Sequence, residues 1–166
     1  MMVKGGGDPL AIAREQFFDA LTTGEGVRCP CCGRIGRVYK RKFNSGMARV
    51  LARLVALGGE REWVNVRRLF PGVLQRGGEW ARARFWLFVE PRDHRTATAN
   101  PRGDWRVTPW GSQFIREGLS VPKHVYIWDN TPISFSEDTT TFHEALGSHF
   151  DVAELLGTEE RVEAGR

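Results

Sequence analysis

The sequence predicts an α+β protein. A winged helix-turn-helix core is preceded by an N-terminal helix and a cysteine knuckle, and is followed by a β-hairpin and short acidic helices. Three observations predict this class. Between residues 44 and 118, apolar periodicity and turn residues indicate the order helix, short strand, short helix, helix, strand, long loop, strand. The last strand lies in the segment GDWRVTPWGSQFI, where Trp105, Val107 and Phe114 are expected to face the core. All three cysteines lie within residues 29–32.

The N-terminal part is expected to form one helix before the cysteines. Asp8 is a typical N-cap residue, and Pro9 suits the first helical position. Apolar residues then recur at helical spacing up to Leu21, which predicts a helix over 9–21. Behind the cysteines, residues 37–40 are expected to form a short strand.

The core is expected to begin with a helix capped by Asn44 or Ser45 and ended by the Gly58-Gly59 pair. The segment EWVNV then predicts a brief strand, and Asn65 is expected to open a short helix that runs to Leu69. The next segment, about 78–88, predicts a strongly aromatic helix, which is the candidate recognition helix. The apolar stripe of the first core helix comprises Met47, Val50, Leu51, Leu54 and Val55.

Two hairpins are predicted after the aromatic helix. The segments FVE and WRVT flank the polar loop PRDHRTATANPRGD, which indicates a wing with a long, basic tip. Thr108 is expected to cap the turn that follows, and Gly111 to permit a tight turn out of the strand. The segments VPKHVYIW and TPISFS predict the second hairpin, joined by Asp129-Asn130.

The chain is expected to form a single domain with three parts. Residues 8–43 hold the N-terminal helix and the knuckle, 44–118 the winged-helix core, and 119–156 the C-terminal hairpin and helices. Residues 1–7 and 157–166 are expected to be flexible tails.

Charge is unevenly distributed along the chain. The net charge is +4 and the sequence pI about 9.3, although residues 136–166 are strongly acidic. A basic body of this kind is typical of a protein that meets a polyanion. We therefore expect binding of double-stranded DNA, with Arg82 in the major groove and the other basic side chains on phosphates. The predicted nucleic-acid-binding residues are Arg37, Lys40, Arg41, Lys42, Arg67, Arg68, Arg76, Arg82, Arg84, Arg92, Arg95 and Arg102.

The cysteines have the CPxCG spacing of a zinc knuckle. Cys29 and Cys32 are separated by two residues, so both thiolates can bind one Zn²⁺, and Gly33 lets backbone N–H groups turn toward the sulfurs. A structural zinc needs four ligands, and the sequence has no second CxxC motif. The candidates for the remaining ligands are His143 and His149, and otherwise His94, His124 or Cys31. A metal-free knuckle, a redox pair and a site shared with another chain remain open alternatives.

Several classes of protein are disfavoured by the sequence. It has no apolar run of the roughly 18 residues that a transmembrane helix needs, and its start lacks the apolar segment of a secretory signal. The clustered cysteines favour a reducing, cytoplasmic setting over a disulfide framework. The motifs GxSxG, HExxH and GxxxxGK(S/T) are missing, as is the Rossmann glycine pattern, so we expect no enzymatic activity.

Five segments together resemble a set of uncharacterised small proteins from bacteriophages and prophages. They are CPCCG, YKRKFNSGMA, WRVTPWGSQF, VPK and HFDVAEL, and they span about residues 20–156. The resemblance implies a phage origin, and hence the host bacterial cytoplasm, and a winged-helix-like core, but it implies no activity. The chain departs from the pattern at Cys31, inside the knuckle, and at Val152, where an aromatic residue is commoner.

The first functional hypothesis is therefore a phage-encoded DNA-binding protein. The alternative is a non-enzymatic module that binds and modulates a host protein, such as the transcription or defence machinery. In that case the aromatic helix and the acidic C-terminal segment would be the contact surfaces.

Overall fold

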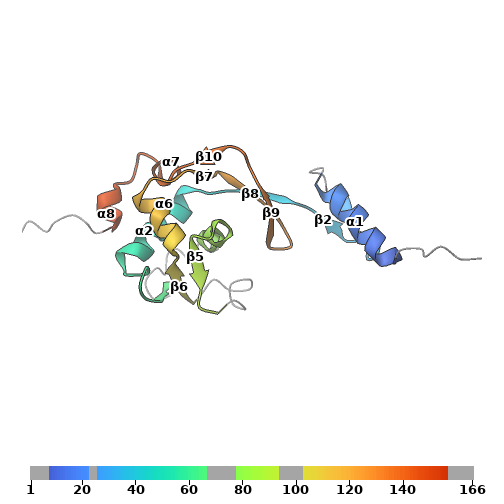
Figure 1. The fold of residues 1–166 in the computed structure, drawn as a ribbon, viewed down its shortest axis with the longest axis horizontal. Helices are drawn as coiled ribbons and strands as arrows, with labels where there is room; N and C mark the ends of the chain where they lie inside the picture. Colours follow the sequence, from blue (N-terminus) through green and yellow to red (C-terminus); the bar gives the residue numbers. More distant parts are fainter. Residues whose placement is uncertain (1–7, 23–25, 67–77, 94–102, 157–166) are drawn as a thin grey trace, which may run out of the picture.

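The computed structural model describes residues 8–22, 26–66, 78–93 and 103–156, which form an α+β structure with antiparallel sheets (Figure 1). The helices are α1 (Pro9–Leu21), α2 (Ser45–Ala56), η1 (Glu79–Trp86), α6 (Pro109–Arg116), α7 (Phe142–Leu146) and α8 (Val152–Leu156). The strands are β1 (Val27–Arg28), β2 (Ile35–Gly36), β3 (Tyr39–Lys42), β4 (Val64–Asn65), β5 (Val89–Pro91), β6 (Asp104–Val107), β7 (Val121–Pro122), β8 (His124–Trp128), β9 (Thr131–Phe135) and β10 (Thr139–Thr140).

The body of the protein is built around α2. The Asn44 side chain accepts a hydrogen bond from the Met47 N–H at 3.0 Å, which confirms the predicted cap. All five residues of the predicted apolar stripe are buried, and they pack against η1, α6, α7 and α8. The helix ends before Gly58, whose φ of 79° lies in the left-handed region.

A three-stranded antiparallel sheet covers another side of this core, in the order β4-β6-β5. Val64 pairs with Trp105, and Val89 with Val107, so the hairpin predicted from FVE and WRVT is present. Trp105, Val107 and Phe114 are buried, as predicted. The tip of the hairpin at 94–102, most of the short helix predicted from Asn65 to Leu69, and both predicted tails lie outside the described residues.

The segment after β6 differs in one respect from the prediction. Thr108 caps α6 by accepting a hydrogen bond from the Gly111 N–H at 3.0 Å. Gly111 does not turn the chain out of the strand, because it lies within α6 itself. The helix crosses the Phe88 carbonyl so closely that a Cβ on Gly111 would lie 2.3 Å from that oxygen. The glycine is therefore required by a close approach.

The predicted aromatic helix is present at the expected position, but its helix type was not predicted. η1 is a 3₁₀ helix of 8 residues, longer than most helices of this kind. Trp80, Ala83 and Trp86 are buried among its core-facing residues, and Leu87 ends the helix with a φ of 60°. The periodicity of the sequence did not reveal the helix type.

A second three-stranded sheet, in the order β3-β8-β9, extends from the body as an arm (Figure 1). The strand predicted at 37–40 is present but lies two residues later, as β3. There Tyr39 pairs with Ile127 and Lys42 with His124. Asp129 and Asn130 join β8 to β9 with φ values of 46° and 60°, so the predicted hairpin turn is of the I′ kind.

At the far end of the arm lie α1 and the small β1–β2 hairpin (Figure 1). The predicted cap of α1 is confirmed, because the Asp8 side chain accepts a hydrogen bond from the Leu10 N–H at 3.1 Å. Phe17 lies against Gly36 of β2, where a Cβ would come within 2.5 Å of the ring. Phe17 and Phe18 both contact Trp128, with ring centroids 6.2 and 5.7 Å apart. We call this region, residues 8–22 and 26–36, the tip of the arm.

The Glu60 side chain links α6 to the turn that follows α2 through hydrogen bonds. Its carboxylate accepts two hydrogen bonds from Arg116, at 2.8 and 3.2 Å, and one from Ser112. The hydrogen bonds from Arg116 lower the pKa of Glu60 below its usual range. Because the folded protein then binds fewer protons than the unfolded chain, stability rises with pH through this window.

Replacing Glu60 by glutamine is expected to reduce stability by at most about 1 kcal/mol at neutral pH, because Arg116 is half exposed and water screens the pair. The difference from the wild type should shrink as the pH falls through the lowered pKa of Glu60. Urea unfolding between pH 7 and pH 3 measures this difference in the free energy of unfolding. The control is Glu62→Gln at an exposed neighbour. A Glu60→Gln deficit that stays constant into acid would contradict the prediction.

Candidate nucleic-acid interface

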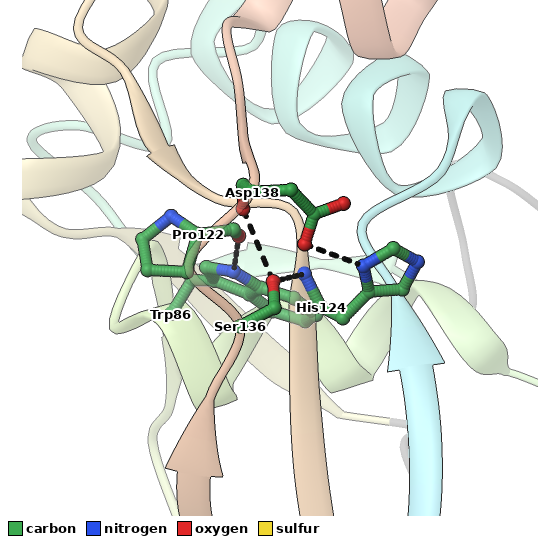
Figure 2. A network of polar contacts seen from close by, with 5 residues as sticks. All are labelled: Trp86, Pro122, His124, Ser136 and Asp138. Atoms are coloured by element: carbon green, nitrogen blue, oxygen red, sulfur yellow. Dashed lines mark hydrogen bonds and ion pairs between the residues drawn. The ribbon is translucent and has the colours of Figure 1, made fainter.

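A polar network lies at the root of the arm, where strands β8 and β9 meet the body (Figure 2). The Ser136 hydroxyl accepts the His124 N–H at 3.0 Å and donates to the Asp138 carbonyl at 3.1 Å. The His124 Nδ1 lies 3.2 Å from the Asp138 carboxylate. Hydrogen bonding by Ser136, followed by that of His124, lowers the pKa of Asp138. The Trp86 indole N–H donates to the Pro122 carbonyl at 2.6 Å, so η1 is tied to the same place.

The pairing register separates the arm residues into two faces. Val125 and Ile127 of β8 are buried and belong to the hydrophobic core. Residues directly opposite each other share a face, so Lys40 lies beside Tyr126 and Lys42 beside His124 on the other side. We call this second side the basic face of the arm, formed by Lys40, Lys42, His124, Tyr126 and Trp128.

The basic face combines charge with aromatic surface. The Lys40 ammonium lies 5.7 Å from the Tyr126 ring centroid, within the range of a cation–π contact. Lys40 and Lys42 are exposed, and Tyr126 and Trp128 are partly exposed. Arg34 and Arg37, also exposed, lie along the chain between the knuckle and β3. Exposed basic residues thus continue along the chain from the arm into the tip.

Arginines on the body differ from those on the arm in their partners. Arg82 is paired with Glu79, Arg106 with Glu90, and Arg92 with Asp104 at 3.5 Å. Among the residues that the structure describes, no ion pair involves the basic side chains of residues 34–42. Opposite charges thus offset these body arginines locally, whereas the bases at 34–42 keep their positive charge. Arg53 and Arg61, which are exposed on the body, are likewise in no ion pair among the described residues.

The predicted binding residues are divided accordingly. The structure brings Arg37, Lys40, Arg41 and Lys42 together along β3 and the chain that enters it, although Arg41 lies on the core-side face, over the Tyr39 ring at 5.4 Å. It places Arg82, Arg84 and Arg92 on the body. The remaining predicted residues lie outside the described part of the chain: Arg67, Arg68, Arg76, Arg95 and Arg102.

Arg84 has a structural role in this arrangement. Its guanidinium lies 4.5 Å from the Phe85 ring centroid and donates to the Asn130 side chain at 2.8 Å, which joins η1 to the β8–β9 turn. Burial lowers the pKa of Arg84. An arginine engaged in this way is poorly placed to reach a base edge, unlike the role expected for a residue of a recognition helix.

The cysteines form a tight turn between β1 and β2. The Cys29 N–H donates to the Arg34 carbonyl at 2.7 Å, and the Gly33 N–H donates to the Cys29 carbonyl at 2.9 Å. Gly33 has a φ of 72°, a conformation that favours glycine. Backbone N–H groups of Cys32 and Cys31 hydrogen-bond the Cys29 sulfur and lower the pKa of its thiol.

The histidines predicted to complete a zinc site lie elsewhere. His143 belongs to α7 and His149 follows it, at the end of the molecule opposite the β1–β2 hairpin (Figure 1). His124 lies at the root of the arm and contacts Asp138, and His94 is outside the described residues. In the described part of the chain, no three His, Cys, Asp or Glu side chains are grouped to hold a metal ion.

Tyr126, Trp128 and His124 were not singled out from the sequence as members of a binding surface. Their alternation with Val125 and Ile127 in HVYIW was the available signal, since successive strand residues face opposite sides. What the sequence did not reveal was the strand beside them.

Comparison with known proteins finds no match to the chain among protein-family models, curated proteins or solved structures. The resemblance to phage and prophage proteins therefore stays a prediction. None of the helices in the described residues is both long and apolar enough to cross a membrane.

Proposed function

We propose that the protein binds double-stranded DNA and that the arm is its main phosphate-binding surface. The observation that carries this proposal is a contrast in partners: four body arginines, Arg82, Arg92, Arg106 and Arg116, are paired with carboxylates, and the bases at 34–42 are in no ion pair among the described residues. Clustered like charges repel one another unless a polyanion or counterions neutralise them. A DNA backbone presents closely spaced phosphates that can neutralise these side chains.

A winged-helix interpretation of the body supports the same function. The element order α2, β4, η1, β5, β6 and the strand order β4-β6-β5 agree with a helix followed by a three-stranded wing sheet. The departure is η1, whose large side chains are mostly buried and whose arginines are engaged. In this proposal the body positions the protein on the duplex, and the arm supplies most of the electrostatic affinity.

The arm is expected to bind with little sequence preference. Lysines contribute point charges to phosphate oxygens, and such contacts carry no base information. Partly exposed Tyr126 and Trp128 add apolar surface beside the lysines, against sugar or base edges. Binding should therefore weaken steeply with salt and tolerate changes of sequence.

The double variant Lys40→Glu/Lys42→Glu is expected to weaken DNA binding about tenfold or more at 0.1 M salt, because two phosphate contacts become repulsions. The slope of log K against log [salt] should also fall in magnitude by about 2. Fluorescence anisotropy with a labelled duplex of random sequence, over a range of salt, measures both quantities.

The matched control is Arg53→Glu/Arg61→Glu, which makes the same charge change at two exposed positions of the body. It should reduce affinity far less than the arm variant. Equal losses in both variants would show that net charge alone is responsible and would contradict the role of the arm. No binding by the wild type, even at low salt, would contradict DNA binding itself. The host-protein alternative would then rest on the exposed apolar side chains of α1: Leu10, Ile12 and Phe18.

A further inference from the structure

The cysteine turn presents half of a zinc site in a place where a second molecule can reach it. The turn lies at the end of the arm, opposite the end of the molecule that holds α7 and α8 (Figure 1). Cys31 and Cys32 are exposed, and Cys29 is partly exposed. α1 packs against the β1–β2 hairpin, and none of the three cysteines belongs to the buried core.

The turn combines the CPxCG spacing of a zinc knuckle with a tightly closed backbone. Its two ends are closed by the hydrogen bonds of Cys29 with Arg34 and Gly33, at 2.7 and 2.9 Å. Gly33, directly after the second cysteine of CPxCG, has a φ of 72°, the left-handed conformation that favours glycine.

Two thiolates are not enough for a structural zinc, which is tetrahedral and takes four protein ligands. His143 and His149 lie at the other end of the molecule and His124 at the root of the arm, whereas His94 is outside the described residues. Among the described residues, no third ligand joins the cysteines in a metal-binding group. The missing ligands are most simply supplied by the same two cysteines of another copy.

We propose that Cys29 and Cys32 of two copies of this chain bind one Zn²⁺ together, and that the zinc joins the two molecules tip to tip. The arrangement is a closed two-fold dimer, since the same patch is used on both molecules. Each zinc is held by four thiolates, and binding releases the thiol protons. The inference does not rest on DNA binding.

The charge and the surface of the tip fit this arrangement. Arg28 donates to the Gly33 carbonyl at 2.7 Å, and Arg34 follows the knuckle, so each tip brings positive charge to the contact. A zinc with four thiolates carries a net charge of −2, which offsets the repulsion between two such tips. Ile35 is 67 % exposed beside the knuckle, and a second tip would cover it.

The test is elemental analysis combined with light-scattering mass on the full chain, purified under a non-thiol reductant and loaded with zinc alone. The expected result is one zinc per two chains and a dimer that becomes a monomer on addition of a strong chelator. Replacing zinc with Co²⁺ should produce the absorption of a tetrahedral four-thiolate site. One zinc bound per monomer would overturn the proposal, as would a protein that binds no zinc or a dimer indifferent to the chelator.

Three variants assign the ligands. Cys29→Ser and Cys32→Ser should each abolish the zinc and the dimer, whereas the matched control Cys31→Ser, in the same turn, should retain both. Loss of zinc in Cys31→Ser to the same extent would overturn the assignment. The chelator experiment uses only the wild type, so it decides the question even if a cysteine variant folds poorly.

Discussion

Replacing Phe43 by alanine is expected to destabilise the protein by about 3–5 kcal/mol, the usual cost of removing a fully buried phenylalanine ring. Phe43 is 0 % exposed and lies between β3 and α2. Its ring contacts those of Trp86, Phe88 and Phe114, each with a centroid distance of 5.4 Å and an edge-to-face angle. The variant would leave a cavity at the point where η1, β5 and α6 meet, and three large rings cannot easily close it.

Urea unfolding followed by tryptophan fluorescence measures the loss, with the midpoint lowered and the slope little changed. A loss of this size is a large share of the total stability of a typical domain, about 5–15 kcal/mol. Phe135→Ala on β9 is the matched control, because the same ring is removed from an exposed position. It should change stability by about 0.5 kcal/mol or less. Similar losses in the two variants would contradict the central place given to Phe43.

Phe43 also explains how the arm is connected to the body. Its N–H donates to the Lys123 carbonyl at 2.9 Å, which continues the pairing of β3 with the chain that enters β8. Its side chain meanwhile enters the aromatic core. One residue therefore belongs both to the edge of the arm sheet and to the packing of the body, so the direction of the arm depends on the core.

Local signals account for the parts of the fold that the sequence predicted well. Asp8, Asn44 and Thr108 each cap a helix through hydrogen bonds that span two or three residues. The turn at Asp129-Asn130 is likewise determined by residues that tolerate positive φ. Such features require no knowledge of distant parts of the chain, and they were placed correctly.

The arm could not be predicted in the same way, because its pairing is not local. Lys40 lies opposite Tyr126, and no pattern in YKRK identifies HVYIW as its partner. The misplaced strand at 37–40 has the same origin, since the register of β3 is set by β8.

The candidate site shows the same division. Which residues are basic was evident from the sequence, but which of them keep their charge unpaired depends on distant acids. Arg106 and Glu90 come from paired strands, and Arg116 and Glu60 from a helix and a turn far apart in sequence. The distinction between the arm and the body, on which the proposed function rests, is a property of the fold.

Gly111→Ala is expected to destabilise the protein by about 1–3 kcal/mol or more, the cost of overpacking a rigid contact. The sign is the opposite of what helix propensity predicts, since alanine is favoured over glycine inside a helix by about 1 kcal/mol. A Cβ on Gly111 would lie 2.3 Å from the Phe88 carbonyl oxygen and 2.9 Å from its carbon. Both are backbone atoms, so no side-chain rotation can relieve the contact.

The clash cannot be relieved by a shift of α6, because Phe88 makes two further contacts. Its carbonyl accepts the Thr108 N–H at 3.0 Å, and its ring stacks on that of Phe114 at 4.3 Å, so α6 cannot move away without breaking both. Thermal and urea unfolding of Gly111→Ala measure the effect. Gln113→Ala, at an exposed position of the same helix, is the control and should stay within about 0.5 kcal/mol of the wild type. A Gly111→Ala variant as stable as this control would mean that α6 and the Phe88 backbone do not approach as closely as the fold requires.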